Sequence, residues 1–287
     1  MQNDKKLARY YHLNPNNNHF LNPQLTATMS AELLASRREA TLILTLSNPG
    51  AKNALHPDMY AAGIEALSTA ERDHAIRAVV ITGADNFFCA GGNLNRLLAN
   101  REQDPSVQAA SIDQLHNWVE AIRDCPKPVI AAVEGAAAGA GFSLALACDL
   151  IVSGASTKFV MAYVKVGLTP DGGASWFLSR ALPRQLASEI IMEGKAVSAA
   201  RLHQSGLVNR VLPDGHALSD ALDWSDELAA LSPNALENIK GLLREAPTNT
   251  LPQHFEAEKQ KFVESLHHAD GLEGITAFLE KRKPHYR

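Results

Sequence analysis

The sequence predicts an α/β fold, because short apolar or β-branched runs alternate with helical patterns through most of the chain. The runs expected to be strands are 41–46, 78–82, 129–133 and 150–152. The first three end in turns rich in Gly, Asn, Asp, Pro or Ala. Since open α/β sheets bind their ligands at the carboxyl ends of strands, these three turns are the expected place for a site.

The pattern divides the chain into three parts. Residues 1–30 are polar and rich in Asn without sustained periodicity, which predicts a poorly ordered extension. Residues 31–215 carry the alternation of strands and helices and form the expected core. Residues 216–287 are helical, with apolar residues at i, i+3 and i+4 in 220–231, 233–244 and 251–266.

Composition argues against several classes of protein. The 287 residues are 46% hydrophobic, enough for a sizeable core, and the net charge of −4 gives no global basic field for nucleic acid. No apolar run suits a membrane span or a signal peptide, so we expect a cytoplasmic protein. Three cysteines without a CxxC pair predict packing residues rather than disulfides. Eleven histidines without ligand spacing predict no metal.

The turns differ in how much they indicate. Residues 48–55 leave a strand and enter a helix, and alone they indicate only a turn with a helix cap. Residues 86–94 contain the paired glycines Gly91 and Gly92, where a backbone can come close to a ligand. Residues 135–141 are Gly and Ala only, between a buried strand and an apolar helix. They leave backbone N–H groups unpaired at a helix N-terminus, which is one way to hold an oxyanion.

A dinucleotide site is an alternative for the third turn, but the GxGxxG spacing and a downstream acidic residue are absent from the sequence. Taken together, the three turns resemble the crotonase (enoyl-CoA hydratase/isomerase) superfamily. The resemblance covers nearly all of 38–287. Its further motifs are Asp149, Lys158-Phe159, 167–173 and 278–283.

The resemblance implies a crotonase-like spiral of ββα units with a C-terminal helical region that forms trimers or dimers of trimers. It implies an acyl-CoA thioester as substrate, with no cofactor besides the coenzyme A of that substrate. By matching motifs, the N–H groups of Gly92 and Ala140 form the oxyanion hole. The resemblance also implies that coenzyme A contacts Asn53, Ala54, Leu55 and Ala90, and that Phe278 or Lys281 reaches a neighbouring subunit's nucleotide.

The sequence departs from the hydratases of that family at both of their catalytic glutamates. Ser143 and Tyr163 occupy these positions, and neither side chain is a good base near neutral pH. With Trp176, they are expected in the acyl pocket. Asp171 remains as the candidate base, in the loop that the resemblance places over the acyl group, as in isomerase-like members of phenylacetate breakdown.

Two interpretations of the acidic residues stay open at this point. Asp171 is alternatively a turn residue that caps the helix expected at 175–182. Glu134 is a further candidate acid, although its place before Gly135 is more typical of a surface residue at a strand end. The pocket walls are expected in 94–118 and 163–178, with 100–111 as a flexible loop.

These observations favour an acyl-CoA enzyme that forms an enolate and isomerises a double bond, with Asp171 as the base. An alternative within this class is an enoyl-CoA or ring-opening hydratase that uses Asp171 with Ser143 or Tyr163 to orient water. An alternative of another class is a protein that binds acyl-CoA or RNA without turnover, and the low basic charge argues against RNA.

Overall fold

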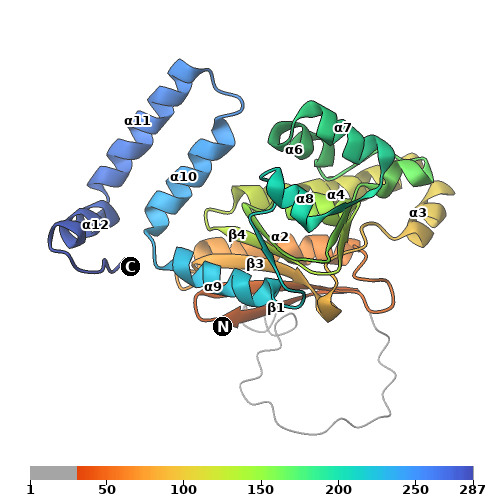
Figure 1. Cartoon of the computed structure of the whole chain (residues 1–287), viewed down its shortest axis with the longest axis horizontal. Coiled ribbons are helices and arrows are strands. Elements are labelled where there is room, and N and C mark those ends of the chain that lie inside the picture. The colour runs from red at the N-terminus through yellow and green to blue at the C-terminus, as the bar shows by residue number, and fades with distance from the viewer. Residues whose placement is uncertain (1–30, 287) are drawn as a thin grey trace, which may run out of the picture.

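The computed structural model describes residues 31–286, so the extension predicted at 1–30 lies outside the described residues. Two sheets form the centre of the fold (Figure 1). The larger sheet has the order β1-β2-β3-β4-β6-β9, and the smaller has the order β5-β7-β8. In the larger sheet β1 runs antiparallel to β2, and every other neighbouring pair is parallel.

The strands confirm the four predicted runs, which are β2, β3, β4 and β6. The full set is β1 (Glu32–Arg38), β2 (Thr41–Ser47), β3 (Ala78–Gly83), β4 (Val129–Val133), β5 (Ala136–Ala138), β6 (Leu150–Gly154), β7 (Lys158–Val160), β8 (Ala196–Ser198) and β9 (Arg210–Leu212). In the parallel part of the sheet each strand is reached by a crossover connection, as parallel pairing requires.

The helices that lie between strands are α2 (Pro57–Arg72), α3 (Leu94–Arg101), α4 (Pro105–Asp124), α5 (Ala140–Ala147), α6 (Ala174–Ala181), α7 (Arg184–Glu193) and α8 (Ala199–Gln204). The C-terminal helices are α9 (Ala217–Ala229), α10 (Pro233–Glu245), α11 (Leu251–His267) and α12 (Ala269–Leu279). Two 3₁₀ turns, η1 (Ala84–Asn86) and η2 (Ala162–Val166), lie in loops of the site described below.

Side chains of the larger sheet pack on both of its faces, because successive residues of a strand point in opposite directions. In β3, Val79 and Ile81 belong to the main core, whereas Val80 belongs to a second cluster that includes residues of α9. All residues of β4 are buried, which is typical of a parallel strand covered on both faces. Helix α9 therefore covers one face of the sheet, although it begins after the boundary predicted near residue 215.

The segment 100–111, expected to be a flexible loop, is instead the end of α3, a three-residue turn at 102–104 and the start of α4. Asp104 Oδ1 accepts a hydrogen bond from the Ser106 N–H at 2.9 Å, and Pro105 takes the first helical position. Both features are typical of a helix start. Helix α4 then buries Leu115 and Trp118 against the core. The flexible-loop prediction is wrong because the polar residues of an exposed first helical turn have the same composition as a loop.

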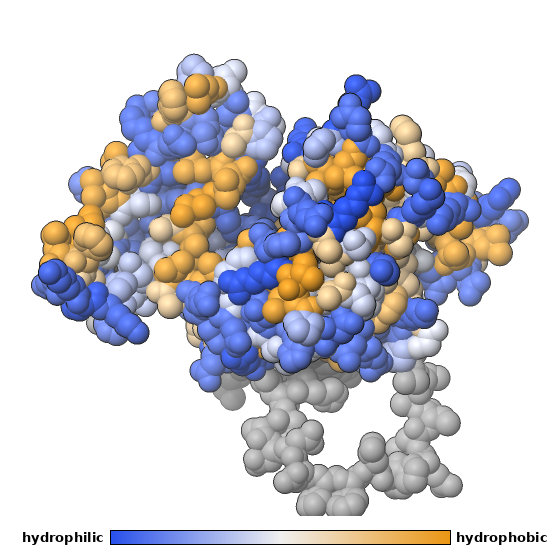
Figure 2. Space-filling model, viewed as in Figure 1, coloured by the Kyte–Doolittle hydropathy of each residue, from blue (hydrophilic) through white to orange (hydrophobic). Residues whose placement is uncertain are grey.

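Helices α10, α11 and α12 extend away from the sheets (Figure 1). Lys240 of α10 anchors them, because its Nζ donates to Asp149 Oδ2 at 2.6 Å and to the Lys127 carbonyl at 2.9 Å. Figure 2 shows apolar surface along these helices. The exposed large apolar side chains there include Ile239, Leu243, Leu251, Phe255, Phe262, Leu272 and Phe278. Within residues 31–286, helices of the length and apolarity needed to cross a membrane are absent.

Candidate active site

Three loops that follow β2, β3 and β4 lie side by side. Isolated parallel bridges pair Leu55 with Gly92 and Cys89 with Ala137. The Leu55 N–H donates to the Gly91 carbonyl at 2.8 Å, and the Ala138 N–H donates to the Cys89 carbonyl at 2.9 Å. The structure thus brings the three turns singled out in the sequence to one edge of the sheet, as parallel strands do with their carboxyl ends.

Asn53 ties the first loop to the second. Its Nδ2 donates to the carbonyls of Ala84 at 2.9 Å and Phe87 at 2.6 Å, and its Oδ1 accepts from the Asn48 N–H at 3.0 Å. The side chains of Asn53, Ala54 and Leu55 are all buried. A contact between this loop and coenzyme A would therefore use backbone atoms rather than these side chains.

Gly91 sets the close approach of the second and third loops. Its φ is +89°, and a Cβ at this position would lie 2.5 Å from the Ala138 carbonyl oxygen and 3.3 Å from the Ala140 nitrogen. A side chain would force the loops apart, so glycine is required here. The backbone of Gly92 consequently lies beside the first residue of α5.

The N–H groups of Gly92 and Ala140 are the donors predicted for the oxyanion hole. Neither N–H donates to a protein acceptor within residues 31–286. Ala140 begins α5, where the first N–H groups have no intrahelical partner and the helix dipole favours negative charge. Two unpaired backbone donors on adjoining loops are the kind of donor pair that an oxyanion hole uses.

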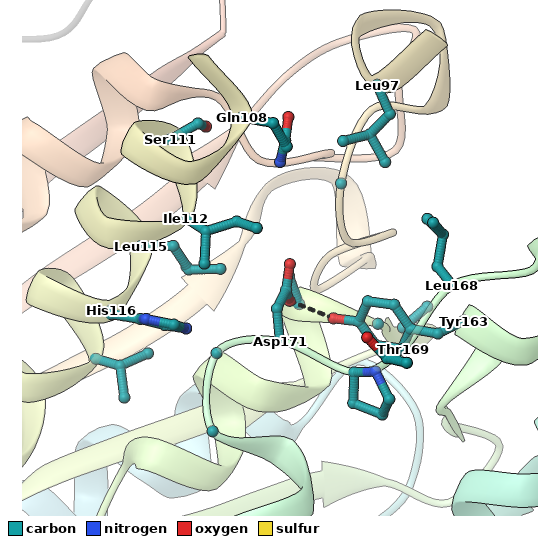
Figure 3. A pocket seen from close by; sticks show the side chains of 18 of the residues that line it. Leu97, Gln108, Ser111, Ile112, Leu115, His116, Tyr163, Leu168, Thr169 and Asp171 are labelled. Carbon is teal, nitrogen blue, oxygen red and sulfur yellow. Dashed lines mark hydrogen bonds between the residues drawn. The ribbon is translucent and has the colours of Figure 1, made fainter. Parts of the chain in front are cut away.

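A cavity of about 770 Å³ lies in front of these loops. Gly92, Ala140 and Ala90 form part of its wall, and Tyr163, Asp171 and Trp176 form another part. Figure 3 shows that Leu97, Ile112, Leu115 and Leu168 add apolar side chains. The walls from α3, the first part of α4 and the loop before α6 lie within the two ranges that the sequence indicated. Tyr60 of α2, Arg123 of α4 and the loops that carry Ala90 and Ala140 also line the cavity and lie outside those ranges. The cavity is large enough for an acyl chain.

Asp171 and Tyr163 form a hydrogen-bonded pair in the cavity wall. The Tyr163 phenol donates to Asp171 Oδ1 at 2.5 Å, and the other carboxylate oxygen points into the cavity (Figure 3). Burial is the main cause that raises the pKa of the Tyr163 phenol, and the Asp171 charge adds to it. The phenol therefore keeps its proton well above neutral pH and remains a donor to the carboxylate.

The alternative interpretation of Asp171 as a helix cap is not supported. Gly173, with φ of +82°, takes the N-cap position of α6, and that cap has no side-chain hydrogen bond. Asp171 accepts the Ala174 N–H at 3.3 Å through its backbone carbonyl only. Its carboxylate is thus directed away from the helix start and toward the cavity.

Ser143 supports the Asp171 loop from behind and is absent from the cavity wall, in contrast to the expectation for this residue. Its side chain is fully buried, and its Oγ donates to the Asp171 carbonyl at 2.9 Å. A Cβ on Gly172 would lie only 2.8 Å from Ser143 Cβ. The reason is that all residues of α5 are buried, so this position faces protein.

Glu134 is buried, which corrects the expectation of a surface residue at a strand end. Its Oε1 accepts hydrogen bonds from the N–H groups of Gly215 at 3.0 Å and Ala217 at 2.9 Å. The carboxylate therefore satisfies donors at the start of α9, a structural role. Glu134 is not among the cavity residues and does not serve as the further acid.

The cysteines are packing residues, as predicted. Cys89, Cys125 and Cys148 are all buried and free. Burial raises the pKa of the Cys89 thiol to about 12, so this side chain is not a thiolate near neutral pH. Within residues 31–286 there is also no group of three or more His, Cys, Asp or Glu side chains placed to hold a metal ion.

The two C-terminal residues expected at coenzyme A lie away from the cavity of their own chain. Phe278, at the end of α12, is exposed, and neither Phe278 nor Lys281 lines the cavity of its own chain. Their contact with a neighbouring subunit's nucleotide stays a prediction. Tyr60 and Arg96 also line the cavity. Arg96 lies in the range 94–118 expected for the pocket walls, in the first turn of the helix that follows Gly92, whereas no sequence pattern indicated Tyr60.

Comparisons with known proteins show which family the chain resembles. The family model described as enoyl-CoA hydratase/isomerase matches residues 36–287. The 1,2-epoxyphenylacetyl-CoA isomerase of Escherichia coli K12 is 36% identical over 259 residues, which cover 88% of this chain and 97% of the relative. The 2,3-dehydroadipyl-CoA hydratase of the same strain is 36% identical over 258 residues, or 90% and 99% of the two chains. The crystal structure of an enoyl-CoA hydratase from Polaromonas sp. JS666 has a TM-score of 0.88 and 59% identity, covering 89% of this chain and 100% of that one.

Proposed function

Because the chain belongs to the enoyl-CoA hydratase/isomerase family, we propose that it isomerises a double bond in an acyl-CoA thioester, with Asp171 as the general base. One observation carries this proposal. The Asp171 carboxylate is held by Tyr163 in the wall of a cavity that also contains the free N–H groups of Gly92 and Ala140. A base and two oxyanion donors in one cavity are the parts that enolate chemistry requires.

In the proposed reaction the thioester carbonyl accepts hydrogen bonds from the Gly92 and Ala140 N–H groups. The free oxygen of Asp171 takes a proton from a carbon of the acyl chain, and the electrons of that C–H bond move toward the carbonyl oxygen as an enolate. The protonated Asp171 then returns the proton two carbons away, which moves the double bond. Fixed donors are most effective here because negative charge develops on the oxygen only during the reaction.

Isomerisation fits the site better than hydration by two carboxylates. The acidic residues of the cavity wall are Asp171 and Glu120, and Glu120 is exposed. Ser143 uses its hydroxyl on the Asp171 carbonyl and does not reach the cavity, so it cannot orient water there. Hydration remains the second candidate because relatives such as the 2,3-dehydroadipyl-CoA hydratase carry that name. In that reaction Asp171 and Tyr163 together would orient the water.

Turnover of a small panel of CoA thioesters tests the proposal. The panel contains a 2-enoyl, a 3-enoyl and a ring-epoxide thioester, and products are separated by chromatography. We expect a shifted double bond, or for the ring epoxide a rearranged ring, without added water. Predominant formation of 3-hydroxyacyl-CoA from the 2-enoyl thioester would favour the hydratase instead.

Replacing Tyr163 by Phe is expected to lower kcat about tenfold or more and to change KM little. A hydrogen bond to a charged group contributes about 1.5–3 kcal/mol, and its loss frees the Asp171 carboxylate to rotate from its working position. Steady-state kinetics of the variant measure this. Because the pKa of the phenol is raised, we also expect no loss of wild-type activity from Tyr163 ionisation below pH of about 10. A kcat equal to that of the wild type in a folded Tyr163→Phe variant would show that Tyr163 does not position Asp171 for catalysis.

We propose that the chain assembles as a homotrimer or a dimer of trimers through α10, α11 and α12. The exposed apolar side chains of these helices support the proposal, since a monomer would leave them in water. Assembly would also bring Phe278 and Lys281 toward a neighbouring subunit's coenzyme A. Light scattering at micromolar concentration is expected to report a trimer or hexamer. A stable monomer at that concentration would contradict the proposed assembly.

A further inference from the structure

Arg96 is a cavity residue whose charge lacks a carboxylate partner. It lies in the first turn of α3 and lines the cavity. Its Nη2 donates to Ser111 Oγ at 3.2 Å, while its Nε is buried without a hydrogen-bond partner. Within the described part of the chain Arg96 forms no ion pair. A guanidinium has five N–H donors. Besides Ser111, Tyr60 lies within hydrogen-bonding reach of Arg96, and the remaining donors are available to a ligand.

The other cavity arginine is in a different situation. Arg123 lies over the ring of Trp176, with its guanidinium carbon 4.8 Å from the ring centroid. The aromatic face offsets part of its charge. Exposed arginines elsewhere, such as Arg201, pair with carboxylates through two hydrogen bonds. Arg96 alone combines burial of a donor nitrogen with a position in the cavity wall and no anion beside it among residues 31–286.

Tyr60 of α2 forms the inner wall beside Arg96 and is almost fully buried. Burial is the largest cause that raises the pKa of Tyr60 to about 12, while the Arg96 charge acts in the opposite direction and the Asp171 charge in the same one. The charges of Arg96 and Asp171 therefore both affect the pKa of the Tyr60 phenol inside the cavity. Tyr60 and Ser111 add neutral hydroxyl groups that can donate to an oxygen bound by Arg96.

We propose that Arg96, with Ser111 and Tyr60, binds a carboxylate carried by the acyl group, so that the preferred substrate is the CoA monothioester of a dicarboxylic acid. This inference rests on the proposed function and names its substrate class. A planar guanidinium binds a carboxylate through two parallel hydrogen bonds, and a buried donor without an acceptor is costly until such a ligand arrives. The apolar side chains of Leu97, Ile112 and Leu115 suit the carbon chain between the two ends.

A phosphate of coenzyme A is the competing anion for Arg96. Arg96 lines the same cavity as Asp171 and the apolar side chains of Leu97, Ile112 and Leu115, and this surrounding suits an acyl chain better than a nucleotide. A carboxylate at the end of an aliphatic chain needs a cation near apolar side chains, and Arg96 offers one. Binding of the phosphates becomes an outcome of the test.

Binding of saturated CoA thioesters tests the inference without requiring turnover. We would measure the Kd of succinyl-, adipyl- and suberyl-CoA against butyryl-, hexanoyl- and octanoyl-CoA by calorimetry. At the best chain length the wild type is expected to bind the dicarboxylic member roughly 30-fold or more tightly. Arg96→Gln should reduce that preference to within about threefold by weakening only the dicarboxylic ligand. Arg101→Gln, on the same helix but exposed and outside the cavity wall, should keep it.

Three results would overturn the inference. They are no preference for a dicarboxylic ligand at any length, an equal loss of affinity for both members of a pair in Arg96→Gln, and an unchanged preference in that variant. The second result would place Arg96 at the coenzyme A phosphates. Because these ligands do not react, their binding is independent of the reaction catalysed. If the isomerase proposal were wrong, the turnover assays would show it, and the binding preference for dicarboxylic ligands would be unchanged.

Discussion

Replacing Asp171 by Asn is expected to lower kcat by roughly 10²–10⁴-fold while the affinity for an acyl-CoA ligand changes little. The Asn side chain keeps the size of Asp and can still accept the Tyr163 hydroxyl through its oxygen, so the loop retains its hydrogen bond. What the substitution removes is the proton acceptor. Steady-state kinetics with a 3-enoyl-CoA and calorimetry with a saturated acyl-CoA separate the two effects.

Ser143→Ala is the matched control for Asp171→Asn. It removes a hydrogen bond to the backbone of the same residue and leaves the carboxylate in place. The expected cost is a loss of about 0.5–1.5 kcal/mol in the free energy of unfolding, with a much smaller change in kcat. If Asp171→Asn kept wild-type turnover, Asp171 would not be the base, and Glu120 at the cavity wall would be examined next.

Gly92→Val is expected to reduce kcat/KM by at least roughly 10²–10³-fold, because the branched side chain would occupy the position of the thioester carbonyl. A Cβ on Gly92 would meet only Leu97 Cδ1, at 3.8 Å, so the variant has room to fold. Circular dichroism and thermal unfolding would check that it does. Kinetics equal to those of the wild type in a folded variant would contradict the placement of the hole.

Gly91→Ala gives the opposite pattern and serves as the contrast. A Cβ there would lie 2.5 Å from the Ala138 carbonyl oxygen, and the φ of +89° disfavours any side chain. We expect a loss of stability or of soluble protein, rather than a folded protein with a blocked cavity. We therefore expect Gly91 to be required for folding and Gly92 to be required for space at the thioester carbonyl.

The parts of the site that follow from local sequence could be predicted. The strands at 41–46 and 129–133 are runs of apolar or β-branched residues, and the turns after them contain glycines, of the kind that a close approach of the backbone requires. Asp171 could be placed in the cavity because the Gly-Leu-Thr-Pro-Asp-Gly-Gly segment resembles a known motif. These features depend on residues close together in the chain.

The parts that depend on distant contacts could not be predicted. On sequence alone Glu134 is a candidate acid. Its carboxylate accepts hydrogen bonds from the N–H groups of Gly215 and Ala217, which are far away in the chain, so the sequence does not reveal this structural role. The resemblance places Ser143 in the pocket, at the position of a hydratase glutamate, and the helix that carries it is apolar all round, so the sequence does not show which way this side chain faces. Arg96 and Tyr60 meet only through the packing of α2, α3 and α4 around the cavity. The sequence thus indicates which segments form helices and strands, but it does not indicate which side chains from distant segments contact one another.

The reaction in water labelled with oxygen-18 distinguishes isomerisation by Asp171 from hydration. The enzyme would be incubated with 3-hexenoyl-CoA and with 3-hexenedioyl-CoA, and the acyl products analysed by mass spectrometry. We expect the corresponding 2-enoyl-CoA as the main product, free of the heavy oxygen, and almost none of it from the Asp171→Asn variant. A 3-hydroxyacyl-CoA that carries oxygen-18 and forms faster than the 2-enoyl isomer would show that the enzyme is a hydratase.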